Sequence, residues 1–250
     1  HSDHGGDNGW AKWIRTWTSE ENRHGDVLNK YLYLSGRVNM REVELTTQHL
    51  ITDGFDIGTA RDPYKNFVYT SFQELASYVA HINVAKVARK RGHKLLAKMS
   101  KIIAGDEMRH HLAYTEFVKQ IFKHDPSEMM LAFQHMMKHK IIMPALNLRQ
   151  SGGKIGDTFD QFSIVAQRAG VYTGFDYVDI LRKLNAAWEI DKIEYAIEVS
   201  GTVLKGILLT HSHFDHLHLA ETLEIKTIVL YGCHTKKLQY RIMTLHNYKQ

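Results

Sequence analysis

The sequence of 250 residues has little cysteine, little proline and no long hydrophobic run. Its single cysteine, Cys233, excludes an intrachain disulfide framework and fits a reducing compartment. Only three prolines interrupt a chain rich in helix-forming residues, which favours a mostly helical structure. No run of about 18 apolar residues occurs, so we expect no membrane span. No block of Lys and Arg interleaved with aromatic residues predicts a nucleic-acid site.

What the chain has in excess is positive charge, with a formal net charge of +5. This balance is compatible with an acidic partner such as nucleic acid, an acidic carrier protein or an anionic membrane. The alternative is a basic surface that is simply solvated. Hydrophobic residues make up 44% of the chain and charged residues 24%, which is ordinary for a globular protein of one large or two small domains.

Apolar residues recur at steps of three and four in three segments, and each segment is predicted to be a helix. The first runs over 10–33 and stops at Ser35-Gly36, the second runs from Pro63 to about Gly92, and the third covers 96–121. Further helices are expected at 126–147, 157–169 and 173–187.

Near Lys192 the pattern changes from helical to β-like. Apolar runs rich in β-branched residues and bounded by glycine predict short strands at 196–201, 203–211 and 224–232. The chain is therefore divided into a helical domain over 1–192 and a short α/β segment over 193–250.

Two Glu-x-x-His motifs, Glu21 with His24 and Glu107 with His110, lie in phase with the apolar faces of their predicted helices. Positions three apart share a helix face, so each motif directs a carboxylate and an imidazole to one point. Glu74 is a third glutamate in phase with such a face. A buried ionised glutamate needs a partner or a metal, and this donor set suits iron or manganese better than zinc or copper. With 17 histidines in the chain, roughly one Glu-x-x-His motif is expected by chance. The alternative is therefore a helix surface on which Glu and His are simply solvated.

Three further residues are predicted to support this site. Asp106 is a candidate to orient the second ring nitrogen of His24, because ligating imidazoles usually donate to a carboxylate. Ser77, one turn beyond Glu74, is a candidate to place a hydroxyl beside the metal. Trp17 is a candidate shield or electron relay. The plain alternatives are a surface acid, a small packing residue and a core tryptophan.

These motifs resemble those of the soluble acyl-acyl-carrier-protein desaturases of the stearoyl type. The resemblance covers about residues 10–192 and implies a mostly α, ferritin-like helical bundle with a short α/β tail. It implies a diiron centre with five of its ligands in this chain: Glu21, His24, Glu74, Glu107 and His110. It also implies a supporting role for Asp106 and a hydroxyl, from Ser77, where many members have threonine. The matching stretches are WTSEENRHGDVLNKYLYLSGRVNM, DPYKNFVYTSFQELAS, IIAGDEMRHHLAYT, MMLAFQHMMKHKIIMPA and FSIVAQRAGVYTGFDYVDIL.

The resemblance also implies a reaction. An acyl chain on acyl carrier protein would receive a cis double bond, with two iron ions, O2 as co-substrate and ferredoxin as electron donor. A homodimer is implied, in a bacterial cytoplasm or alternatively in a plastid. The family's sixth ligand, a glutamate on a helix upstream of EENRH, has no counterpart here, so we expect the bundle to be incomplete at its N-terminus. We therefore expect weak or no iron binding and little activity from this polypeptide alone. A ferritin-like metal-binding protein without catalysis is an alternative.

A second motif, LLTHSHFDH at 208–216, resembles the signature of the metallo-β-lactamase superfamily. The resemblance implies zinc or iron ligation by His211, His213, Asp215 and His216. It makes a metal-dependent hydrolase another alternative. The strands that precede this motif in that superfamily and the ligands that follow it are not matched, so we expect no hydrolase activity and suspect a fused or mis-joined reading frame.

Overall fold

The structure is a computed structural model that describes residues 8–190, 198–199 and 202–203. Over these residues the chain forms seven α-helices, one 3-10 helix and one pair of two-residue strands. The helices are α1 (Gly9–Ser35), α2 (Met40–Asp53), α3 (Pro63–Lys90), α4 (Lys94–His124), α5 (Pro126–His139), η2 (Pro144–Asn147), α6 (Asp157–Arg168) and α7 (Gly174–Ala187). The strands β1 (Glu198–Val199) and β2 (Thr202–Val203) pair antiparallel.

The helices begin where the sequence supplies caps. Asn8 and Asn39 accept backbone N–H groups at the starts of α1 and α2, and Asp62 does the same for α3, with Pro63 as its first residue. Thr173 and Asp176 form a reciprocal capping box at α7. These local signals explain why the starts of α1, α3 and α7 could be read closely from the sequence, whereas the cap at Asn39 was not recognised.

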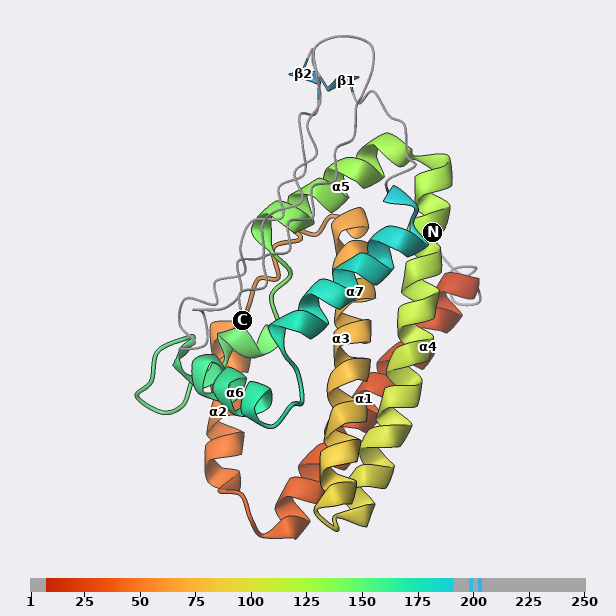
Figure 1. Ribbon diagram of the computed structural model, residues 1–250. Helices are drawn as coiled ribbons and strands as arrows, with labels where there is room; N and C mark the ends of the chain where they lie inside the picture. The colour runs from red at the N-terminus through yellow and green to blue at the C-terminus, as the bar shows by residue number, and fades with distance from the viewer. Residues whose placement is uncertain (1–7, 191–197, 200–201, 204–250) are drawn as a thin grey trace, which may run out of the picture.

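The two longest helices, α3 and α4, run side by side in opposite directions and form the centre of the molecule (Figure 1). The helix α1 packs against α4, whereas α5 and α7 pack against α3. Among the described residues no helix is long and apolar enough to cross a membrane.

The hydrophobic core lies where α3, α4, α5 and α7 meet. It is made of fully buried side chains that include Val68, Phe72, Val118, Met129, Phe133, Met136, Ile180 and Leu184. Burying one such side chain stabilises the fold by about 1.5–3 kcal/mol. In contrast, α1 buries only His24, so polar and aromatic contacts fix much of its position.

The mostly helical bundle predicted from the sequence is confirmed, including stops at Gly36 (φ +63°) and Gly92 (φ +80°), where a left-handed backbone favours glycine. One prediction was wrong: the helix expected at 126–147 ends at His139, because Lys140 takes a φ of +61°. The separate 3-10 helix η2 follows at Pro144. The helix α2 was not predicted from the sequence, and it buries none of its residues.

Candidate metal centre

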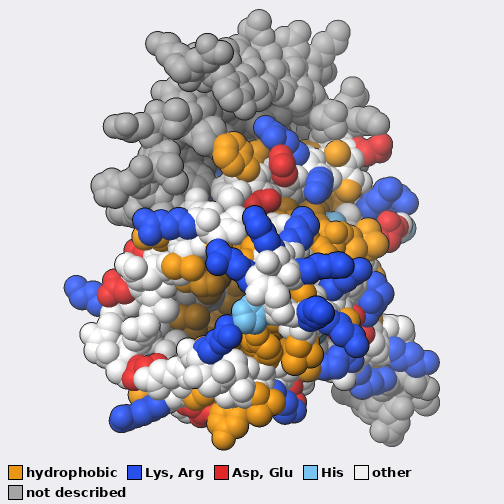
Figure 2. All heavy atoms as spheres, turned by 60° about the horizontal axis from the view of Figure 1, so that its bottom comes forward, with side chains coloured by type: hydrophobic (Ala, Val, Ile, Leu, Met, Phe, Trp, Pro, Cys, Tyr) orange, Lys and Arg blue, Asp and Glu red, His pale blue; other side chains and the backbone are white. Residues whose placement is uncertain are grey.

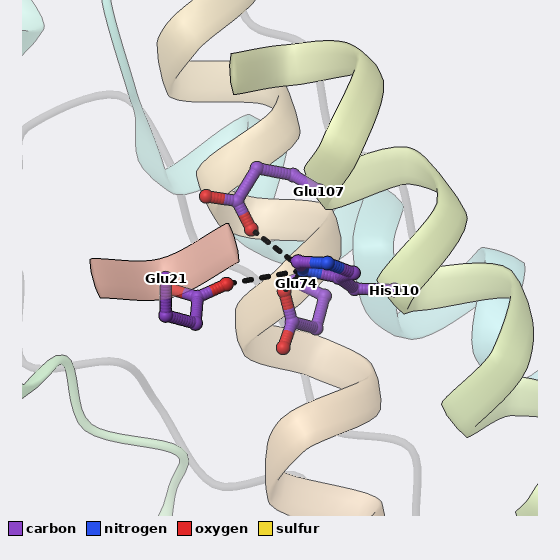
Figure 3. A group of neighbouring side chains, drawn as sticks. All are labelled: Glu21, Glu74, Glu107 and His110. Carbon is purple, nitrogen blue, oxygen red and sulfur yellow. Dashed lines mark hydrogen bonds and ion pairs between the residues drawn. The ribbon is translucent and has the colours of Figure 1, made fainter. Parts of the chain in front are cut away.

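Three helices bring four of the predicted ligands to one point between them (Figure 3). Glu21 comes from α1, Glu74 from α3, and Glu107 and His110 from α4. One donor atom of each lies within 4.8 Å of the donor atoms of the other three. Glu21 is half-buried and the other three are buried. The shared helix faces read from the sequence therefore converge in the tertiary structure.

His24 lies beside this group, and it completes a two-sided arrangement. Its Nδ1 is 3.3 Å from Glu107 Oε1 and 3.8 Å from Glu21 Oε1. On the other side, His110 Nδ1 is 3.1 Å from Glu21 Oε1, 3.3 Å from Glu74 Oε2 and 3.8 Å from Glu107 Oε2. Both imidazoles thus turn Nδ1 inward, and Glu107 faces one imidazole with each of its oxygens.

The outward nitrogens of both imidazoles also meet carboxylates. His24 Nε2 lies 3.0 Å from Asp106 Oδ2, as expected from the sequence for a residue that orients this ring. His110 Nε2 lies 2.7 Å from Glu20 Oε2. Glu20 was not predicted from the sequence. The signal that could have revealed it is that both acids directly precede a candidate ligand glutamate.

Trp17 contacts the candidate ligands directly. Its Nε1 donates to Glu74 Oε1 at 2.9 Å, and its ring makes edge contacts with His110 and Tyr114 at centroid distances of 6.4 and 5.9 Å. The indole therefore holds one glutamate oxygen in addition to packing. Ser77 is half-buried on α3, one turn beyond Glu74.

Burial and crowding of charge displace the pKa values of these groups. Burial raises the pKa of Glu74 to about 8. For Glu107, burial is outweighed by contacts with His110 and His24, which lower its pKa. Burial alone would lower the pKa of His110, but the surrounding carboxylates outweigh it and raise that pKa to about 12. The pKa of His24 is raised in the same way, by Glu107 and Asp106. At Asp106, the contacts with His24 and two arginines outweigh burial and lower the pKa to about 2. Near neutral pH His110 and Glu74 therefore hold protons that offset the negative charge, and the raised pKa of His24 favours its protonated form.

The residues present fit a metal pair. Glu21 Oε1 and His24 Nδ1 are buried atoms that face the cluster without a hydrogen bond to any described residue. Buried polar atoms normally have a partner, and a carboxylate oxygen and a deprotonated imidazole nitrogen are atoms of the kind that coordinate metals. Three carboxylates and two imidazoles form a hard, oxygen-rich donor set suited to iron or manganese.

A family model described as fatty acid desaturase matches residues 1–221. The chain belongs to the fatty acid desaturase family. It is 54% identical over 184 residues to the chloroplastic stearoyl-[acyl-carrier-protein] 9-desaturase of Spinacia oleracea, and 52% identical over 184 residues to that of Ricinus communis. Each alignment covers 74% of this chain and 46% of the relative. It is also 48% identical over 201 residues to the chloroplastic stearoyl-[acyl-carrier-protein] 9-desaturase 2 of Arabidopsis thaliana, covering 80% of this chain and 48% of that relative.

The chain thus spans about half the length of the curated relatives it matches. The resemblance inferred from the sequence motifs is confirmed. The second motif, with His211, His213, Asp215 and His216, lies outside the described residues, and the family match over 1–221 includes it. The predicted division of the chain near Lys192 remains a prediction.

Proposed function

We propose that this chain carries the diiron centre of an O2-dependent acyl-acyl-carrier-protein desaturase of fatty acid biosynthesis. The observation that supports it most directly is the convergence of three carboxylates on two imidazoles whose Nδ1 atoms face each other across Glu107. Such paired sites in helical bundles are typical of di-iron carboxylate proteins. The relatives are named for 9-desaturation of stearoyl-acyl carrier protein, so a stearoyl chain is the substrate we propose.

In this proposal Glu21, His24, Glu74, Glu107 and His110 hold two iron ions. The ions, when bound, would let O2, two electrons and two protons remove two hydrogen atoms from an unactivated chain, which would leave a double bond and two molecules of water. The protein's own groups fix the ligands in place: Asp106 accepts from the His24 ring, and Trp17 donates to Glu74. Ser77 places a hydroxyl one turn from Glu74.

The proposed function is tested with the chain, ferrous iron, reduced ferredoxin, O2 and stearoyl-acyl carrier protein. We expect a cis-monounsaturated product, identified by mass spectrometry, whose formation stops when iron is withheld. Because iron binding is expected to be weak, the iron dependence of the product is more informative than its amount. Iron uptake without any acyl product would instead support a non-catalytic metal-binding protein. The hydrolase alternative is not favoured, since the desaturase family match extends over its motif.

One end of the molecule is suited to an acidic carrier protein. Residues 75–105 contain seven Lys and Arg and no Asp or Glu. The positive charge of this one stretch therefore exceeds the formal net charge of the whole chain, which is +5. The seven lie at the end of α3, in the turn and at the start of α4, and all are exposed. We call them the basic end: Lys86, Arg89, Lys90, Arg91, Lys94, Lys98 and Lys101. Figure 2 shows Lys and Arg gathered at this end around apolar side chains, and Leu95 and Ile102 there are more than half exposed.

The positive charges at the start of α4 do not stabilise that helix. Its first turn contains no acidic residue, and cations near a helix N-terminus oppose the helix dipole. Lys94 and Lys98 are also like charges one turn apart, which is unfavourable. No carboxylate of the described residues forms a salt bridge with the basic end. An acidic partner would relieve this repulsion, and we propose acyl carrier protein as that partner.

Reversing the charge of Lys94 and Lys98 to glutamate is expected to weaken binding of stearoyl-acyl carrier protein by roughly tenfold and to flatten its dependence on salt. The matched control reverses Lys119 and Lys123, which are exposed and equally spaced at the other end of α4. Titration by fluorescence anisotropy measures both variants. Equal weakening by the two double variants would show a nonspecific effect of net charge and contradict this docking surface.

We further propose ferredoxin as the electron donor, a homodimer as the assembly and the plastid as the location. The chloroplastic names of the relatives support the plastid over the bacterial cytoplasm.

A further inference from the structure

The two Glu-x-x-His segments share more than their candidate ligands. Residues 20–24 read Glu-Glu-Asn-Arg-His, and residues 106–110 read Asp-Glu-Met-Arg-His. In each segment an acid precedes the glutamate and an arginine precedes the histidine. The first positions of the two segments, Glu20 and Asp106, therefore occupy equivalent places on α1 and α4.

The structure pairs these positions across the two helices. Asp106 on α4 lies 3.0 Å from Nε2 of His24 on α1, and Glu20 on α1 lies 2.7 Å from Nε2 of His110 on α4. Each acid thus contacts the imidazole of the opposite helix. The contact of Asp106 with His24 therefore corresponds, position for position in the repeated motif, to the contact of Glu20 with His110.

The two arginines complete a ring of charge around these acids. Arg23 Nη2 lies 3.0 Å from Asp106 Oδ2, and Arg109 Nη2 lies 3.1 Å from Glu20 Oε1 and 2.6 Å from Asp106 Oδ1. The acids are shielded, with side-chain exposures of 18% for Glu20 and 7% for Asp106, whereas both arginines are more than half exposed. The arginines keep both carboxylates ionised and fixed, so each remains a strong acceptor.

We propose that Glu20 is a positioning residue for His110, equivalent to Asp106 for His24. Its Oε2 accepts the Nε2–H proton and so holds the ring with Nδ1 directed at Glu21, Glu74 and Glu107. A neutral imidazole offers only one nitrogen to a metal, and the acceptor on the other nitrogen decides which one it is. Without Glu20 the His110 ring loses this constraint, whereas His24 keeps its own.

The first test uses the metal-free protein and does not depend on the proposed function. Imidazole N–H protons held in buried hydrogen bonds exchange slowly with water, so we expect the NMR spectrum of the 15N-histidine-labelled chain to contain two protected Nε2–H resonances, one from His24 and one from His110. The buried contacts of the Nδ1 atoms, such as that of His111 with Ser71 O at 2.9 Å, are assigned separately. Glu20→Ala should remove one and Asp106→Ala the other. Glu20→Gln keeps an uncharged acceptor and should retain a shifted, faster-exchanging signal. If Glu20→Ala leaves both resonances protected, the proposal is wrong.

The second test measures metal binding and rests on the proposed diiron site. We expect Glu20→Ala to lower Co2+ affinity by about 10–100-fold, as loss of a supporting partner typically does. Glu20→Gln should lie between Glu20→Ala and the wild type, and the exposed Glu44→Gln should bind as wild type does. The visible spectrum of bound Co2+ should change in Glu20→Ala, since a misoriented imidazole alters the ligand geometry.

The outcomes separate the two hypotheses. Failure of the wild type and all variants to bind Co2+ would contradict the proposed metal function, and the NMR result would still decide the role of Glu20. Normal Co2+ affinity and an unchanged spectrum in Glu20→Ala, with a wild type that binds, would contradict the positioning role alone.

Discussion

Replacing Glu107 with alanine is expected to remove paired-metal binding. Glu107 is the side chain whose two oxygens face the two imidazoles, at 3.3 Å from His24 Nδ1 and 3.8 Å from His110 Nδ1. Its loss leaves the two imidazoles without the carboxylate between them. We expect Co2+ and Fe2+ affinities to fall by more than the roughly 10–100-fold that loss of a supporting partner costs. Isothermal titration calorimetry measures the affinity and the number of ions bound.

The control is Glu116→Ala, which removes an exposed carboxylate from the same helix. Circular dichroism should show equal helix content for both variants, because Glu107 is not one of the side chains that form the hydrophobic core among α3, α4, α5 and α7. If Glu107→Ala binds two ions with wild-type affinity, Glu107 is not a ligand and the proposed centre is wrong.

Metal affinity is expected to rise steeply with pH between about 6 and 8. The pKa values of His110, about 12, and of Glu74, about 8, are raised, and that of His24 is raised as well. At neutral pH His110 and Glu74 therefore hold protons, and a metal ion must displace them. Glu107, whose pKa is lowered, is already ionised and releases none. His110 and Glu74 together account for about two protons released, so affinity should change by about a hundredfold for each unit of pH, and the slope should lessen near pH 8 as Glu74 ionises.

Calorimetry in buffers with different ionisation enthalpies counts these protons directly. The variant Glu74→Gln, which has no proton to lose at this position, should show a shallower dependence. A metal affinity that does not change between pH 6 and 8 would contradict the protonation states assigned to the cluster.

Much of the fold and of the centre was accessible from the sequence because helical periodicity is a local property. The steps of three and four placed Glu21, Glu74 and Glu107 on core-facing sides of their helices, and caps and glycines located the ends. The helix α2, which buries none of its residues, was not predicted. The end of α5 at His139 depends on the left-handed backbone of Lys140, which no residue preference for lysine predicts.

Of the two acids that contact the outward nitrogens of the imidazoles, only one was predicted from the sequence. Asp106 was predicted through its expected role toward His24, but Glu20 was not, although it holds the equivalent position in its own segment. The basic end could be counted from the sequence as a stretch of seven cations without an acid. Only the structure shows that these cations form one exposed face next to the turn at Arg37. At that place Arg37 Nη1 lies 3.2 Å from Nε2 of His93.

The amino-acid order therefore accounts for which residues share a helix face, because a fixed rise and turn per residue make that relation independent of the surroundings. The angle and register at which α1 crosses α4 decided which acid contacts which imidazole. The pairs Asp106 with His24 and Glu20 with His110 are 82 and 90 positions apart. Contacts at that separation depend on how two helices pack, and packing is a property of all the side chains at their interface together.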